Sequence, residues 1–239
     1  MLAGRAAIAY RSDPSLPTRD MMQLIGMLDS PYVRRVAIAL RLLGIAFEHR
    51  PLSVFSTFAE FARINPVVKA PTLVCDDGTV LMDSLLIIDH LETVAGRSLW
   101  PAATDERLRA LRITGLALAA CEKTVQIVYE RNLRPADKQH APWLDRMHGQ
   151  MTAALAALDA ELARHPLARD EAGLTQAGLC AAITWNFQAI KLERPVAAAH
   201  CPALADYAQA LERLPAFVAT PAIETHDAST PGFSAAARG

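Results

Sequence analysis

Three short polar motifs contain the residues of this chain that could hold an anion. Asp29-Ser30-Pro31-Tyr32 begins an expected helix, Lys69-Ala70-Pro71-Thr72 leads into an expected strand, and Asp83-Ser84 begins another expected helix. A hydroxyl group at a helix N-terminus, beside free backbone N–H groups, is suited to bind negative charge. One hydrogen bond to a charged group contributes about 1.5–3 kcal/mol, and the helix terminus adds ~0.3–1 kcal/mol. Ser30 could therefore lower the pKa of a nearby thiol by roughly two units, which requires ~2.7 kcal/mol.

Each motif also has a purely structural interpretation. Ser30 followed by Pro31 is a normal helix start, with serine as the N-cap and proline in the first turn. Pro71 could be a trans proline at the first residue of a strand, since only about 5–6% of X-Pro bonds are cis. Asp83-Ser84 could simply cap the helix that follows it. These interpretations are compatible with a binding role, and the order and spacing of the three motifs favour that role.

Apolar periodicity around the motifs predicts an α/β unit. The expected strands lie at 22–27, 46–52, 71–75 and 79–82, and the expected helices at 31–43, 57–64 and 84–95. Asp76-Asp77-Gly78 is a strong hairpin signal, and Gly44 ends the first helix. In that helix an apolar stripe should face the core, with Arg34, Arg35 and Arg41 on the solvent side.

The second half of the chain shows only helical patterns. Expected helices lie at 104–133, 143–164, 175–192 and 203–214, after a linker over 97–103. The predicted fold is therefore a small α/β domain with a mixed sheet, followed by an all-helical domain.

These features resemble the glutathione S-transferase family, in the form of a serine-type, bacterial-like cytosolic transferase. The resemblance extends over roughly 22–223, and Tyr32-Val33-Arg34-Arg35-Val36 and Asn65-Pro66 add to it in the first half. It implies a thioredoxin-like N-terminal domain that binds glutathione, then an all-α domain. The expected bounds are a loose leader at 1–20, the glutathione-binding domain at 21–96, the linker at 97–103, the helical domain at 104–225 and a flexible tail at 226–239.

The resemblance also implies a role for each motif. Ser30 would be the catalytic residue that stabilises the thiolate of glutathione, for conjugation to a small apolar electrophile or for peroxide reduction. Ala70 and Pro71, joined by a cis bond, would present backbone groups to the cysteinyl part of glutathione. Ser84 would bind the γ-glutamyl carboxylate, and Asp83 would contact the ammonium group. Glutathione would be a co-substrate, and no metal is expected.

Two features leave alternatives open. Cys121, Val125 and Tyr129 recur at helical spacing and could line the site of the electrophile, although core packing is the commoner reason for such spacing. No cysteine lies beside Ser30, which argues against the reductases of the family that use a cysteine nucleophile, and the Ser-Ser-Cys run of its isomerases is absent. A glutathione-dependent reductase or isomerase, and a non-catalytic binding or regulatory module with the same fold, remain the alternatives.

The expected buried helix at 175–192 departs from the family pattern. Family members cap this helix with a threonine and, three residues later, an aspartate, but here Thr175 is followed by Gly178. The reciprocal cap bond is therefore expected to be missing, a loss of about 0.5–2 kcal/mol unless another contact replaces it.

Composition restricts the class of protein. Of 239 residues 52% are hydrophobic and the net charge is −1, which indicates a globular domain without a nucleic-acid or membrane-surface partner. The apolar run at 6–10 is too short for a convincing signal peptide. Four scattered cysteines favour reduced thiols and a cytoplasmic location. A homodimer is expected from the family resemblance.

Overall fold

A computed structural model describes residues 21–223, so the leader and the tail expected from the sequence lie outside the described residues. Its first half contains β1 (Met22–Ile25), α1 (Pro31–Leu43), β2 (Phe47–Arg50), α2 (Phe58–Ile64), β3 (Thr72–Val74), β4 (Val80–Met82) and α3 (Ser84–Ala95). The strands form one sheet in the order β2-β1-β3-β4. β1 is parallel to β2, and β3 is antiparallel to both β1 and β4. The predicted thioredoxin-like unit with a mixed sheet is thus confirmed.

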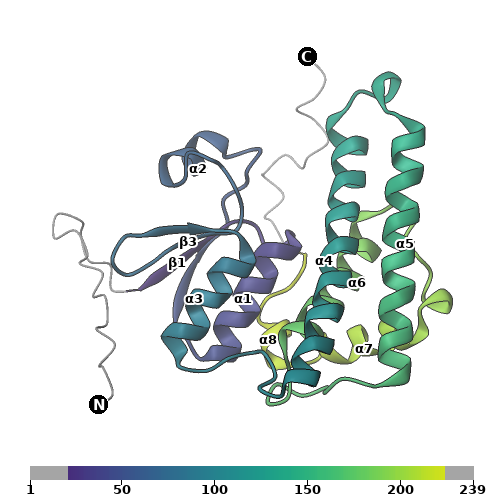
Figure 1. The fold of residues 1–239 in the computed structure, drawn as a ribbon. Coiled ribbons are helices and arrows are strands. Elements are labelled where there is room, and N and C mark those ends of the chain that lie inside the picture. The colour runs from purple at the N-terminus through teal and green to yellow at the C-terminus, as the bar shows by residue number, and fades with distance from the viewer. Residues whose placement is uncertain (1–20, 224–239) are drawn as a thin grey trace, which may run out of the picture.

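Helices cover both faces of this sheet (Figure 1). Side chains of a strand alternate between its two faces. Leu24 and Leu73 are buried in the larger core, together with residues of α1 and α3. Ile25 and Val74 belong to a separate small core, which Phe61 of α2 closes. The sheet therefore holds the N-terminal ends of α1 and α3 at fixed positions beside it.

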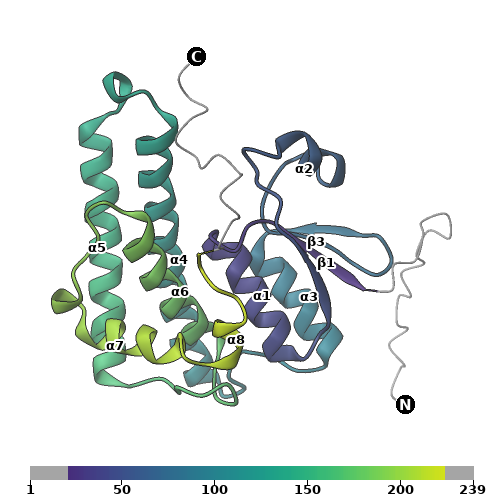
Figure 2. The same ribbon diagram turned by 180° about the vertical axis from the view of Figure 1, so that it is seen from behind.

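The second half is all-helical, as predicted. It consists of α4 (Thr104–Leu133), the turn η1 (Ala136–Lys138), α5 (Ala141–Arg164), α6 (Gln176–Lys191), the turn η2 (Ala198–His200), α7 (Pro202–Leu211) and α8 (Pro215–Val218). α4 packs against α5 and α6, and α7 packs against both α5 and α6. After α7 the chain returns through α8 to the first half, where α8 contacts α1 (Figure 2). None of the described helices is both long enough and apolar enough to cross a membrane.

The prediction that Arg34 and Arg35 face solvent is wrong, whereas Arg41 is exposed as expected. Arg34 and Arg35 are only 1% and 2% exposed. Their side of α1 packs against α6 and α8 of the helical half, so both faces of this helix are covered. Buried guanidinium groups require hydrogen-bond acceptors. Arg34 finds its acceptors in the helical half, and Arg35 lies between the two halves, as described below.

Gly178 is fixed by a contact that the sequence does not reveal. Thr175 makes no side-chain cap bond at the start of α6. A Cβ atom at Gly178 would lie 2.2 Å from Tyr207 Oη and 2.9 Å from Leu174 Cδ1. The buried Tyr207 hydroxyl donates a hydrogen bond to the carbonyl of Ala168 at 3.1 Å. The tyrosine therefore occupies the space that a capping aspartate would need, and its packing stands in place of the missing cap.

We expect Gly178→Asp to destabilise the protein, although it restores the family's capping residue. The new side chain must displace Tyr207, and overpacking of this kind costs about 1–3 kcal/mol, which exceeds the ~1 kcal/mol that a cap contributes. Thermal unfolding of the variant should show a lower Tm. Gly149→Ala on α5 is the matched control, because a Cβ there meets nothing within 4 Å and should leave Tm equal or slightly higher. A Gly178→Asp variant with a raised Tm would contradict this account.

Candidate functional site

The strand register brings the three polar motifs to the same end of the sheet. Ile25 at the end of β1 pairs with Thr72 at the start of β3, and Thr72 also pairs with Met82 at the end of β4. The segment after β1, the segment before β3 and the segment after β4 therefore meet at the same end of the sheet. These segments carry Ser30, Ala70-Pro71 and Asp83-Ser84 respectively.

Gly26 allows the first two motifs to approach each other closely. Its φ of +135° disfavours any side chain. A Cβ atom at this position would lie 2.6 Å from Val33 Cγ2 and 3.2 Å from the Cβ of Ala70. The backbone between β1 and α1 thus lies directly beside Ala70. Two residues after Ala70 the chain enters β3.

Ser30 is the N-cap of α1, with extended backbone geometry and Pro31 in the first turn. Its Oγ accepts a hydrogen bond from Val33 N over 3.5 Å, which is the long limit for such a bond. The cap bond is therefore weak, and the half-buried hydroxyl group remains able to form another hydrogen bond. It can donate its proton to a ligand at the positive end of the helix.

The other two motifs have the backbone geometry of a binding edge. The Ala70–Pro71 bond is cis, as the family resemblance implied. Asp83 has a φ of +75°, which is uncommon for a residue with a side chain and typical of functional sites. Its Oδ1 accepts a hydrogen bond from Leu85 N at 2.9 Å, and its Oδ2 lies 3.7 Å from Lys69 Nζ. Asp83 is the single residue that connects β4 to α3.

A buried arginine supports Ser84. Arg35 Nη1 donates to Ser84 Oγ at 3.3 Å, and Nη2 donates to Gln176 Oε1 of α6 at 3.0 Å. Gln176 Nε2 in turn donates to Glu92 Oε1 at 3.2 Å. Within the described part of the chain, Arg35 Nε is buried without a hydrogen-bond partner. Because Ser84 Oγ already accepts a bond, its own proton is free to point toward an anion at the helix start.

The three residues expected near a second substrate lie in different environments on α4. Cys121 is only 2% exposed. Burial raises the pKa of Cys121 to about 12, so this thiol stays protonated. Val125 is half-buried, whereas Tyr129 is exposed and its ring contacts Phe55. Tyr129 and Val125 are thus better placed than Cys121 to meet a ligand between the two halves.

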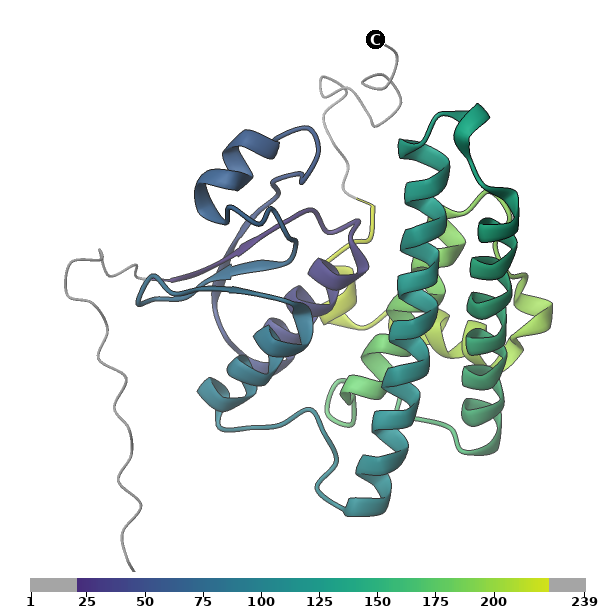
Figure 3. The same ribbon diagram turned by 45° about the horizontal axis from the view of Figure 1, so that its top comes forward.

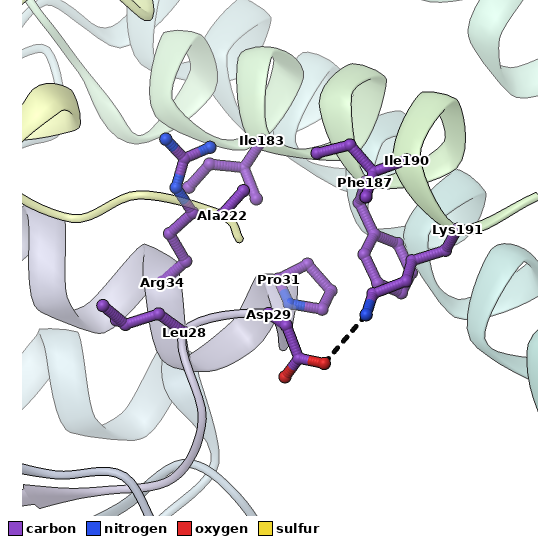
Figure 4. A pocket seen from close by; sticks show the side chains of 9 residues that line it. All are labelled: Leu28, Asp29, Pro31, Arg34, Ile183, Phe187, Ile190, Lys191 and Ala222. Carbon is purple, nitrogen blue, oxygen red and sulfur yellow. Dashed lines mark hydrogen bonds and ion pairs between the residues drawn. The ribbon is translucent and has the colours of Figure 1, made fainter. Parts of the chain in front are cut away.

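An ion pair closes the corner next to Ser30. Lys191 Nζ, at the end of α6, lies 2.8 Å from Asp29 Oδ2 (Figure 4). The pocket beside it has a volume of about 10 Å³, which is the room that one water needs. Its lining comes from both halves of the chain: Leu28, Asp29, Pro31, Arg34, Ile183, Phe187, Ile190, Lys191 and Ala222. Both side chains of the pair are partly exposed, so this contact contributes little to stability.

Comparisons with known proteins agree with this geometry. Residues 24–98 match the family described as glutathione S-transferase, N-terminal domain. A GST-like protein of Escherichia coli, YibF, is 29% identical over 171 residues, which cover 71% of this chain and 84% of that protein. Residues 24–98 thus belong to the glutathione S-transferase N-terminal domain family.

Solved structures of other family members extend the match over most of the chain. A glutathione S-transferase of Methylobacterium radiotolerans, in complex with glutathione sulfonate, has a TM-score of 0.74 at 27% identity and covers 88% of this chain and 99% of its own. A member from Pseudomonas fluorescens Pf-5 with bound glutathione has a TM-score of 0.70 at 29% identity and covers 83% of this chain and 98% of its own. Among residues 21–223 of the chain, no three His, Cys, Asp or Glu side chains lie close enough together to hold a metal ion.

Proposed function

We propose that this protein is a glutathione transferase that binds glutathione along the sheet edge and activates it as the thiolate. The observation that carries the proposal is the position of Ser30, whose weakly bonded hydroxyl group lies at the N-terminus of α1, at the same end of the sheet as the cis Ala70–Pro71 bond. Ser30 would donate a hydrogen bond to the sulfur. Backbone groups of Ala70 and Pro71 would hold the cysteinyl part, and Ser84 and Asp83 the γ-glutamyl end. The similar structures solved with glutathione sulfonate and with glutathione support glutathione as the ligand.

The chemistry would depend on a higher thiolate concentration and on proximity. A thiol with a pKa near ~8.5 is about 1% ionised at pH 6.5, and lowering that pKa by roughly two units ionises half of it. The bound sulfur anion would then attack a small apolar electrophile held between the halves, or the oxygen of a peroxide. Conjugation of this kind is the reaction expected of a detoxification enzyme.

The described cysteines weigh against a reductase with its own cysteine nucleophile. All four are buried. Burial and the nearby Asp77 and Asp76 raise the pKa of Cys75 to about 11, and burial also raises the pKa of Cys180 and of Cys201. Thiols that remain protonated are poor nucleophiles. The sulfur that reacts would therefore come from glutathione.

The exposed leucines of α3 and α4 are consistent with the expected homodimer. Leu86 is 66% exposed and Leu108 is 69% exposed, with Leu85 and Leu111 also exposed near them in sequence. Large apolar side chains in contact with water favour association. We propose a second copy of this chain as the partner, and light scattering of the purified protein at micromolar concentration should give twice the monomer mass. A monomer at that concentration would contradict it.

Affinity and activity together test the proposed function. The full-length protein should be retained on immobilised glutathione and eluted by free glutathione. It should then be assayed with an aryl halide, an organic hydroperoxide and a mixed disulfide of glutathione. Turnover of either of the first two substrates supports the transferase. Failure to bind glutathione would favour the non-catalytic module, and turnover of the disulfide alone would favour a reductase.

A further inference from the structure

Arg35 is a buried cation without an anionic partner in the described part of the chain. Figure 3 shows its helix, α1, between α3 and the helical half, and α1 packs against both α3 and α6. The guanidinium group donates to Ser84 Oγ at 3.3 Å and to Gln176 Oε1 at 3.0 Å, and both acceptors are neutral. Within residues 21–223 Arg35 forms no ion pair, and its buried Nε has no hydrogen-bond partner. Because a buried charge is costly unless it is paired, this arginine requires an anion.

The two carboxylates that belong to this region bond to other groups. Glu92 Oε1 accepts a hydrogen bond from Gln176 Nε2 at 3.2 Å. Asp83 Oδ2 lies 3.7 Å from Lys69 Nζ. The side-chain amide of Gln176 therefore bonds to Glu92 through its nitrogen and to Arg35 through its oxygen, so that the carboxylate and the guanidinium group are bridged without direct contact.

The positive end of α3 lies beside the same guanidinium group. Ser84 is the first residue of α3, a helix of 12 residues with no acidic residue in its first turn. The free N–H groups of such a turn carry partial positive charge. A cation next to them is unfavourable unless an anion neutralises both. The start of α3 thus combines two positive sources with the hydroxyl group of Ser84, which can still donate its proton.

We propose that the unpaired charge of Arg35, held in place by Gln176, makes the site selective for ligands with a carboxylate at the start of α3. This inference rests on the proposed function, which places the γ-glutamyl carboxylate of glutathione there. Arg35 is too deeply buried to touch the ligand, so it is a positioning residue that acts through Ser84 and through its electric field. The low dielectric between the two halves strengthens that field. Because Gln176 belongs to α6, the helical half helps to set the affinity of the first half for glutathione.

Moving one carboxylate to Arg35 tests this proposal without changing the total charge. The double variant Gln176→Glu with Glu92→Gln keeps a hydrogen bond between these two positions and places the negative charge beside Arg35. Glutathione should be compared by calorimetry with 4-aminobutyryl-cysteinyl-glycine, which lacks only the γ-glutamyl carboxylate. The wild type of full length should bind glutathione about 30-fold more tightly than the analogue. In the double variant this preference should fall about tenfold, with the affinity for the analogue unchanged within about a factor of two.

Three single variants separate the effect of charge from that of packing. Arg35→Met removes the charge and should reduce the preference as the double variant does. Arg35→Lys keeps the charge and should keep the preference within about threefold of the wild type. Arg34→Met is the matched control, because it removes the neighbouring buried arginine, which pairs with Glu212, and should leave the preference unchanged. A purely structural defect would instead weaken the binding of both ligands alike.

The outcomes distinguish this inference from the proposed function. If the wild type prefers glutathione and the double variant and Arg35→Met keep that preference, the role of Arg35 is overturned and the glutathione site stands. An equal loss in Arg34→Met, or complete loss in Arg35→Lys, would overturn it too, because the effect would then not follow the charge. Equal binding of both ligands by the wild type would also refute the inference. If the wild type binds neither ligand, the proposed function itself fails.

Discussion

Ser30→Ala should lower kcat/KM for glutathione conjugation about 50-fold at pH 6.5. Without the hydroxyl, the pKa of bound glutathione returns toward ~8.5, so about 1% of it is thiolate instead of about half. The deficit should shrink as the pH rises through 8.5, because the thiol then ionises unaided. The pH profile of the wild type should therefore level off near pH 7, whereas that of the variant should continue to rise. Steady-state kinetics from pH 6 to 9 measure both curves.

Two controls separate loss of activation from loss of binding or folding. S-methylglutathione has no ionisable sulfur, so its affinity should be the same in Ser30→Ala and the wild type. Ser30→Thr retains the hydroxyl and should retain a pH profile of wild-type shape. The cap bond is 3.5 Å long, so its removal should cost less than about 1 kcal/mol of stability. An alanine variant with full turnover at pH 6.5 would refute the catalytic role of this serine.

Arg34→Met should destabilise the protein by about 3 kcal/mol. The Arg34 guanidinium makes a two-pronged pair with Glu212, at 2.6 and 2.7 Å, and its Nε donates to the carbonyl of Thr220 at 2.8 Å. It also lies 5.5 Å from the centre of the Phe217 ring. Removing one partner of a buried pair costs ~3–5 kcal/mol, and the lower value applies because the Glu212 side chain is 34% exposed and water can reach it.

Chemical denaturation should give this difference directly, with Arg41→Met as the control. Arg41 is exposed in the last turn of the same helix, near the Phe47 ring, and its replacement should cost less than ~1 kcal/mol. The double variant Arg34→Met with Glu212→Leu should recover part of the loss, because it removes the carboxylate that Arg34→Met leaves without its cation. If Arg34→Met lowers the free energy of unfolding no more than Arg41→Met does, the ion pair does not hold the two halves together.

The sequence predicted what is encoded by local chemistry. Gly44 and Gly96 end α1 and α3 with left-handed backbone, as expected of C-terminal glycines. The Asp76-Asp77-Gly78 turn joins β3 and β4 as an antiparallel hairpin. Signals of this kind act over a few residues, so they can be recognised without knowing the rest of the fold. The cis geometry of the Ala70–Pro71 bond was predictable only from the family resemblance, because most X-Pro bonds in folded proteins are trans.

What the sequence did not reveal depends on contacts between distant segments. A period of 3.6 residues identifies one apolar face of α1, but it does not show that α6 and α8 cover the opposite face and bury Arg34 and Arg35. The support of Ser84 by Arg35 was missed for the same reason. In the candidate site, the contact between Phe55 and Tyr129 joins residues 74 positions apart (129 − 55), and no local pattern indicates it.

The two buried arginines of α1 also bear on how this fold could be recombined with others. A chimaera that joined residues 21–96 to the helical half of another relative would need acceptors at the positions of Glu212, Thr220 and Gln176. Without them, two guanidinium groups would be buried between the halves with no hydrogen-bond acceptors. The chimaera would then be unstable even if the surfaces of its two halves were complementary in shape. A chimaera of this protein would therefore have to keep all three acceptors together, namely the Glu212 carboxylate, the Thr220 carbonyl and the Gln176 side-chain oxygen.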